Sequence, residues 1–130
     1  MMKYFDEKGN IRNGLLDREA EEKAKSFVHP RDRNSNPLTS AQLRRFYNEF
    51  KGLEKKVAAK GFDATLPLIK MVKSKAAYSA NPKNPKIPRA FKDFLSENID
   101  AINQKRDFEA FMLFFEAVVG FCYGQGMKNN

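Results

Sequence analysis

The sequence is poor in the residues from which most catalytic and metal sites are built. Its 130 residues contain one cysteine, Cys122, and one histidine, His29, so neither an internal disulfide nor a Cys/His zinc site can form. A single cysteine also agrees with a reducing compartment. No glycine-rich phosphate loop stands between a predicted strand and a predicted helix. These absences argue against an enzyme, and we expect no cofactor and no metal.

Export signals and membrane spans are missing as well. The N-terminus, MMKYFDEKGN, lacks the apolar segment of a signal peptide. The most apolar stretch, residues 106–123 (RDFEAFMLFFEAVVGFCY), contains Glu116 and falls short of the roughly 20 mostly uncharged residues that a span needs. We therefore expect a cytoplasmic protein without membrane contact.

Phenylalanine, by contrast, is abundant: the chain has 12 Phe and no Trp. At helical spacing, residues 106–123 are apolar on almost every side, so this helix must be covered on almost every side. It is either the central helix of a bundle or a helix shared with a second chain. The sequence predicts an all-α fold, a compact bundle of about five helices that dimerisation or helix exchange could complete. The other helices are predicted, from their apolar periodicity, at 15–28, 40–60, 64–79 and 89–103.

Two proline-containing segments divide the chain. Residues 29–38 (HPRDRNSNPL) and 81–88 (NPKNPKIP) exclude regular structure. Within a single domain, we expect residues 1–37 to form an N-terminal arm and a peripheral helix, and residues 38–130 to form the core of the bundle. The turn-forming residues of the first 14 positions suit either a loose arm or a small hairpin.

Local signals predict where the two central helices begin and end. Thr39 or Ser40 can cap the helix at 40–60, and Gly61 can end it. Asp63 can cap the helix that follows.

The net charge of +8 is confined to the middle of the chain. Residues 40–92 hold 13 Lys and Arg against 3 Asp and Glu, a net charge of +10. The flanking parts, 1–39 and 93–130, carry +1 (8 against 7) and −3 (3 against 6). Basic charge concentrated in one block is typical of a protein that binds a polyanion, and the alternative is an ordinary solvated face.

The cations of this block fall on the polar sides of two predicted helices. Three of those on helix 40–60 share one face and form a ridge roughly 16 Å long, at about 1.5 Å of rise per residue. Helix 64–79 adds three lysines. A positive surface of this kind can follow the phosphates of a single strand without reading its bases. The candidate RNA-binding residues are Arg44, Arg45, Lys51, Lys55, Lys70, Lys73 and Lys75.

The sequence allows more than one role for three other side chains. Tyr47 and Tyr78 could stack on bases, although each also suits the edge of the core. Glu116 is the one acid in an apolar stretch, and we expect it to pair with a Lys or Arg of a neighbouring helix.

Three stretches of the sequence resemble a known family. LTSAQLRRFYNEF (38–50), LIKMVKSKAAYSA (68–80) and DFEAFMLFFEAVVGF (107–121) look like three blocks of the Csm small subunit of type III-A CRISPR effector complexes, in the same order. Residues 1–37 and the connector 81–88 match no block and inherit no role.

The resemblance implies a non-catalytic helical subunit of a ribonucleoprotein. Such a subunit stacks in several copies along a guide–target duplex and contacts the backbone of the target RNA without reading bases. The implied partners are single-stranded target RNA, guide RNA, the other subunits of the complex and copies of the chain itself. Lys51 and Lys55 depend on the helical-face argument alone, whereas the resemblance carries over to Arg44, Arg45, Lys70, Lys73 and Lys75.

A different function remains open on the same residues. The chain could be a helical protein-interaction module whose basic face meets an acidic protein partner. In that case residues 106–123 would be the main interface, and nucleic-acid binding would be incidental.

We expect the isolated protein to self-associate, because a chain of this size has little surface with which to cover a helix that is apolar on almost every side. A dimer that exchanges helices across residues 81–88 would provide the cover. Light scattering at tens of micromolar measures the mass, and a monomeric value would contradict this expectation.

Overall fold

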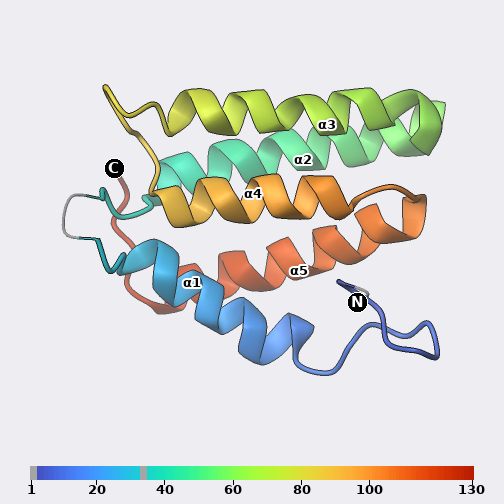
Figure 1. Ribbon diagram of the computed structural model, residues 1–130, viewed down its shortest axis with the longest axis horizontal. Coiled ribbons are helices and arrows are strands. Elements are labelled where there is room, and N and C mark those ends of the chain that lie inside the picture. The colour runs from blue at the N-terminus through green and yellow to red at the C-terminus, as the bar shows by residue number, and fades with distance from the viewer. Residues whose placement is uncertain (1–2, 33–34) are drawn as a thin grey trace.

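A computed structural model describes residues 3–32 and 35–130 of the chain as a bundle of helices that run alternately up and down (Figure 1). The predicted all-α fold is confirmed, since the described residues form helices and one isolated bridge, between Phe5 and Ile11, but no sheet. The elements are a π-helical turn, η1 (Leu15–Glu19), and the helices α1 (Ala20–Val28), α2 (Ser40–Lys60), α3 (Phe62–Ser79), α4 (Arg89–Ala101) and α5 (Lys105–Gly124).

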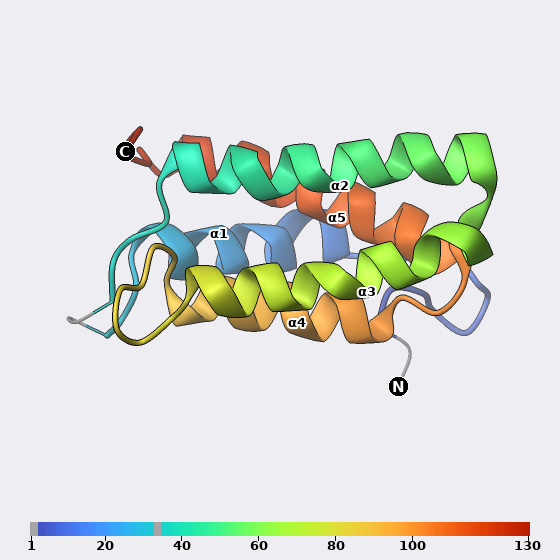
Figure 2. The same cartoon turned by 90° about the horizontal axis from the view of Figure 1, so that it is seen from above.

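The helices lie around a shared interior. α2 packs against α3, and α3 packs against α4 (Figures 1 and 2). α5 lies against α2 and α4 on the other side, and α1 packs along α5. Across the described residues, no helix combines the length and the apolarity that a membrane crossing requires.

Phenylalanine rings from four helices form the centre of the core. Phe115 of α5 lies between Phe50 of α2, at 5.8 Å, and Phe94 of α4, also at 5.8 Å between ring centroids. Phe27 of α1 contacts Phe94 edge-on at 5.2 Å. Such edge-to-face pairs are each worth roughly 0.5–1.5 kcal/mol beyond the apolar area they bury. Phenylalanines of α1, α2, α4 and α5 therefore join these four helices into one core.

α5 is the central helix that the apolar stretch 106–123 predicts. α1, α2 and α4 cover most of its circumference, and among its large apolar residues Leu113 and Tyr123 stand out, with 44% and 47% of their surfaces exposed. One chain thus encloses the helix, so the fold does not require a second copy. Self-association of the isolated protein stays a prediction.

The joint between α2 and α3 consists of one residue. Gly61 has φ 93° and ψ 157°, a backbone conformation that side chains disfavour. The predicted cap by Asp63 is wrong: α3 already begins at Phe62, whose side chain is buried, and Asp63 lies inside the first turn. A carboxylate in that position still favours the helix through its dipole.

The start of α2 is capped from two directions. Thr39 is the N-cap, as predicted, and its Oγ1 accepts a hydrogen bond from the Gln42 amide at 3.4 Å. The chain beyond α5 returns to the same place, where the amides of Ser40 and Ala41 donate to the carbonyl oxygens of Lys128 and Asn129. The last described residues therefore hold the first turn of a helix that begins almost ninety positions earlier.

The N-terminal segment is a small hairpin, one of the two forms that its sequence allows. Tyr4 is 2% exposed, and its hydroxyl donates to Asn98 Oδ1 of α4 at 2.9 Å. Arg106 of α5 places its guanidinium over the Phe5 ring, 4.5 Å from the centroid. These contacts attach the hairpin to α4 and α5. The division of the chain at residues 37 and 38 remains a prediction.

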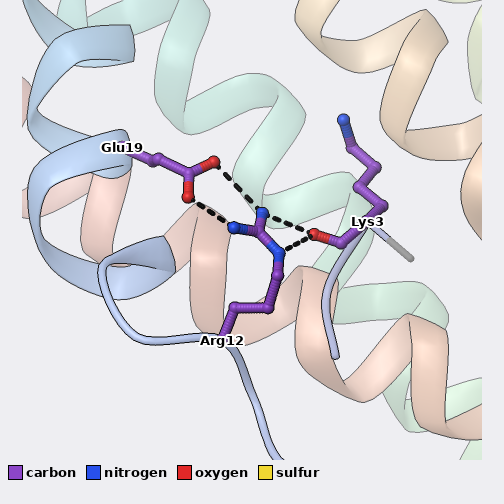
Figure 3. Close-up of polar contacts among 3 residues, drawn as sticks. All are labelled: Lys3, Arg12 and Glu19. Atoms are coloured by element: carbon purple, nitrogen blue, oxygen red, sulfur yellow. Dashed lines mark hydrogen bonds and ion pairs between the residues drawn. The ribbon is translucent and has the colours of Figure 1, made fainter. Parts of the chain in front are cut away.

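Arg12 ties the hairpin to the helix that follows it. Its guanidinium donates to the Glu19 carboxylate, Nη1 to Oε2 at 2.8 Å, and its Nε donates to the Lys3 carbonyl oxygen at 2.9 Å (Figure 3). The hydrogen bond from Arg12 lowers the pKa of Glu19. The Arg12 side chain thus forms hydrogen bonds with both ends of the N-terminal segment, at Lys3 and at Glu19.

Tyr4→Phe should lower the free energy of unfolding by about 1–3 kcal/mol, because it leaves the buried Asn98 Oδ1 without its donor. Tyr78→Phe is the matched control: that ring is 72% exposed, and we expect a change within roughly 0.5 kcal/mol. Urea denaturation followed by circular dichroism measures both. Equal midpoints for the two variants would contradict the role given to the Tyr4 hydroxyl.

Candidate nucleic-acid interface

The solvent-facing side of α2 carries a group of exposed cations that form no ion pair within the described ranges. Arg44, Arg45 and Lys55 are exposed, and no ion pair among residues 3–32 and 35–130 involves them. Lys56, which follows Lys55, is exposed in the same way. The two acids of this helix are paired with other lysines, Glu49 with Lys75 of α3 and Glu54 with Lys51. We call Arg44, Arg45, Lys55 and Lys56 the α2 basic face.

The α2 basic face suits an extended polyanion. Eleven residues separate Arg44 from Lys55, a distance of roughly 16 Å along a helix. Asn48 and Gly52 lie exposed between the two ends, and a Cβ at Gly52 would meet no atom within 4 Å. At Gly52, therefore, no neighbouring side chain stands between the helix and an approaching phosphate.

Lys51 occupies a different environment from the rest of α2. It lies in a groove between α2 and α5 with a volume of about 280 Å³, lined also by Glu54, Glu109 and Glu116. Its ammonium contacts Glu54 Oε1 at 2.7 Å, and this hydrogen bond raises the pKa of Lys51. Three carboxylates beside one lysine make this groove an unfavourable place for phosphate.

Glu116, which we expected to pair with a Lys or Arg of a neighbouring helix, lies in solvent. Its side chain is exposed on the outer side of α5, not enclosed in an apolar setting. No ion pair among the described residues involves Glu116; its charge is the smallest of the contributions to the pKa of Lys51, which the hydrogen bond with Glu54 raises most.

Lys70 and Lys73 face α4. Lys70 Nζ donates to the Ile99 carbonyl oxygen at 2.7 Å, near the last turn of α4, where a cation complements the helix dipole. Burial lowers the pKa of Lys70. Lys73 binds Asp100 Oδ1 at 2.6 Å, and this hydrogen bond lowers the pKa of the Asp100 carboxyl. Both lysines hold α3 to the C-terminal end of α4.

Lys75 faces the opposite neighbour. Its ammonium forms an ion pair with Glu49 of α2, across the seam between α2 and α3. The outermost line of α3 is consequently uncharged: Pro67, Met71, Ser74 and Tyr78 follow one another there at spacings of three and four residues and are all exposed.

The structure thus separates the seven predicted residues into two groups. Arg44, Arg45 and Lys55 stand together on one exposed surface, which also includes Lys56. The other four have protein partners, three of which are distant in sequence; residues 70 and 99, for example, are 29 positions apart. Only the pairing of Lys51 with Glu54, three residues along one helix, had a local signal.

The two tyrosine candidates are separated as well. Tyr47 is partly buried and packs edge-on against Phe115 at 5.5 Å, so it belongs to the edge of the core. Tyr78 is 72% exposed, and the alternative of a core-edge position is wrong for it. The three residues before it in the outer line of α3 are exposed as well, so the ring continues a solvent-facing line of that helix.

Groups that could support chemistry do not gather elsewhere. Among the described residues, no cluster of three His, Cys, Asp or Glu could hold a metal ion. Cys122 is fully buried, and burial raises its pKa to about 12. A thiol that stays protonated is a poor nucleophile.

Comparison with known proteins gives one match. A family model described as Csm2 Type III-A matches residues 12–125. No curated protein and no solved structure matches the chain. The matched range is longer than the three blocks, which span residues 38–121, and it includes η1, α1 and the connector 81–88. The family match therefore extends to residues 12–37, for which the three blocks gave no counterpart.

Lys70→Ala should lower the free energy of unfolding by about 1 kcal/mol, because it removes a hydrogen bond and a cation from the end of α4. Lys55→Ala removes the same side chain from an exposed position, and we expect a change within roughly 0.5 kcal/mol. Thermal or urea unfolding of both variants measures the difference. A larger loss for Lys55→Ala would show that the two groups of cations are assigned the wrong way round.

Proposed function

Since the chain belongs to the Csm2 Type III-A family, we propose that it is a non-catalytic small subunit of a type III-A CRISPR effector complex that holds RNA by its backbone. The family implies assembly with the other subunits of such a complex. Target RNA, paired with a guide RNA, is the proposed ligand, and further copies of this chain are proposed neighbours. We place this assembly in the cytoplasm.

The single observation that carries the proposal is the α2 basic face. Four exposed cations without ion-pair partners stand on it, and the two acids of α2 are engaged by other lysines, Glu49 by Lys75 and Glu54 by Lys51. Cations that lack protein partners can exchange counterions for phosphates without first breaking an ion pair. Their long side chains read no base edge, so binding through this face would be independent of sequence.

The four partnered lysines remain candidates for RNA contact, but each must first break a contact within the protein. Lys51, Lys73 and Lys75 would have to leave a carboxylate before they could bind a phosphate. Lys70 would have to leave a carbonyl oxygen at the end of α4. We therefore expect these lysines to contribute less than the α2 basic face.

A non-catalytic role is consistent with the side chains at hand. The proposed surface consists of Arg and Lys, which bind phosphate but, at their ordinary protonation, do not act as bases. The one cysteine is buried away from it. Cleavage of bound RNA would then fall to other subunits.

The second candidate function, a module that binds an acidic protein, draws on the same α2 basic face. Such a partner would present carboxylates in place of phosphates and would need no RNA. The two functions differ in which polyanion competes, so one titration with two competitors separates them.

Arg44→Ala combined with Lys55→Ala should weaken binding of single-stranded RNA to the full chain and make it less dependent on salt. Each phosphate contact contributes about −0.7 to the slope of log affinity against log salt. Four contacts predict a slope of about −3, and the double variant should flatten it by about 1.4. Fluorescence anisotropy with a labelled oligonucleotide, repeated over a salt series, measures the slope.

Lys73→Ala combined with Lys75→Ala is the control, because it also removes two positive charges from exposed ion pairs. We expect its slope to stay close to that of the parent chain. A flattened slope in this variant and an unchanged one in Arg44→Ala/Lys55→Ala would remove the α2 basic face from the proposal. Competition by polyglutamate as strong as by unlabelled RNA would favour the acidic protein partner.

A further inference from the structure

Tyr78 is the most exposed of the large apolar residues of the described chain. Its ring is 72% exposed, against 49% for Met71 and 47% for Tyr123. It lies in the second-last position of α3, where the amide of Asn81 donates to the Tyr78 carbonyl oxygen at 3.2 Å and starts the turn into the connector. The backbone under the ring is therefore fixed, while most of the side chain is open to solvent.

The position of Tyr78 relative to α2 follows from the pairing of Lys75 with Glu49. α2 and α3 run antiparallel (Figure 2), so one turn further along α3 corresponds to one turn back along α2. That step leads from Lys75 to Tyr78 and from Glu49 to Arg45. Tyr78 and Arg45 consequently face each other across the outer side of the seam, where the α2 basic face ends.

The segment that carries the ring contains charge of one sign, and the nearby carboxylate of Glu49, on α2, is paired with Lys75. Residues 64–92, which contain Tyr78 and the connector, hold seven Lys and Arg and no Asp or Glu. Lys83 and Lys86 of the connector are exposed, and within the described ranges no ion pair involves them. An aromatic face beside cations is the combination that single-stranded nucleic acids bind, with stacked bases and paired phosphates.

We propose that Tyr78 is a stacking platform for one unpaired nucleobase of an RNA strand whose phosphates follow the α2 basic face. This inference rests on the proposed function and extends it from the backbone to the bases. A stacked ring accepts any base, so the contact adds affinity without selecting a sequence. The cations on both sides of Tyr78 favour this ligand over an apolar protein surface, which would leave them without partners.

The absence of tryptophan makes the contact directly observable. The intrinsic fluorescence of the full chain comes from its four tyrosines, and a base stacked on Tyr78 quenches that residue. Titration with a short oligouridylate should therefore reduce the emission. Tyr78→Phe should keep the affinity within about twofold, because phenylalanine also stacks, but should lose most of the quenching. Tyr78→Ala should lower the affinity by roughly tenfold, the size expected for one base–aromatic contact.

Tyr123→Ala is the matched control, since that tyrosine is also exposed but lies on α5 and not on α3. It should leave the RNA affinity unchanged. If Arg44→Ala/Lys55→Ala weakens binding while Tyr78→Ala and Tyr78→Phe behave like the parent chain, the inference is overturned and the proposed function stands. If none of these variants changes the binding, both are overturned, and the exposed line of α3 is left to a protein partner.

Discussion

The enclosure of α5 is the constraint on which the rest of the structure depends. A helix that is apolar on most of its circumference is stable only when other elements remove it from water. In this chain α1, α2 and α4 surround it, and their phenylalanines interlock with those of α5. Because α2 must turn its apolar side towards α5, its cations have to point outwards. The surface proposed to bind RNA is thus a consequence of the core.

The same packing decides which cations remain available to a ligand. α3 is held between α2 and α4, and both neighbours supply carboxylates or carbonyl oxygens at its two edges. The lysines at those edges act as ties between helices, even though they raise the net charge as much as the exposed ones do. Net charge therefore overstates the positive surface, and the pairing of each side chain is the quantity that matters for a polyanion.

Much of the fold was predictable from local pattern, and much of the surface was not. The apolar periodicity of α2 and α5 identified their buried sides, and the Thr39 cap and the Gly61 stop had short-range signals. The partners of Lys70 and Lys73 come from the end of α4, and no local pattern announces a contact across that distance. The exposure of Tyr78 has the same origin, because it depends on where α2 and α4 leave α3 uncovered.

The glycine joint between α2 and α3 has a consequence for how this family member can change over time. With one residue between the helices there is no slack, and an inserted residue at the start of α3 would turn that helix by about 100° relative to its neighbours. Tyr78 would then no longer lie opposite Arg45. Side chains along α2 and α3 can therefore change during evolution, whereas the number of residues in the joint between the two helices must stay the same.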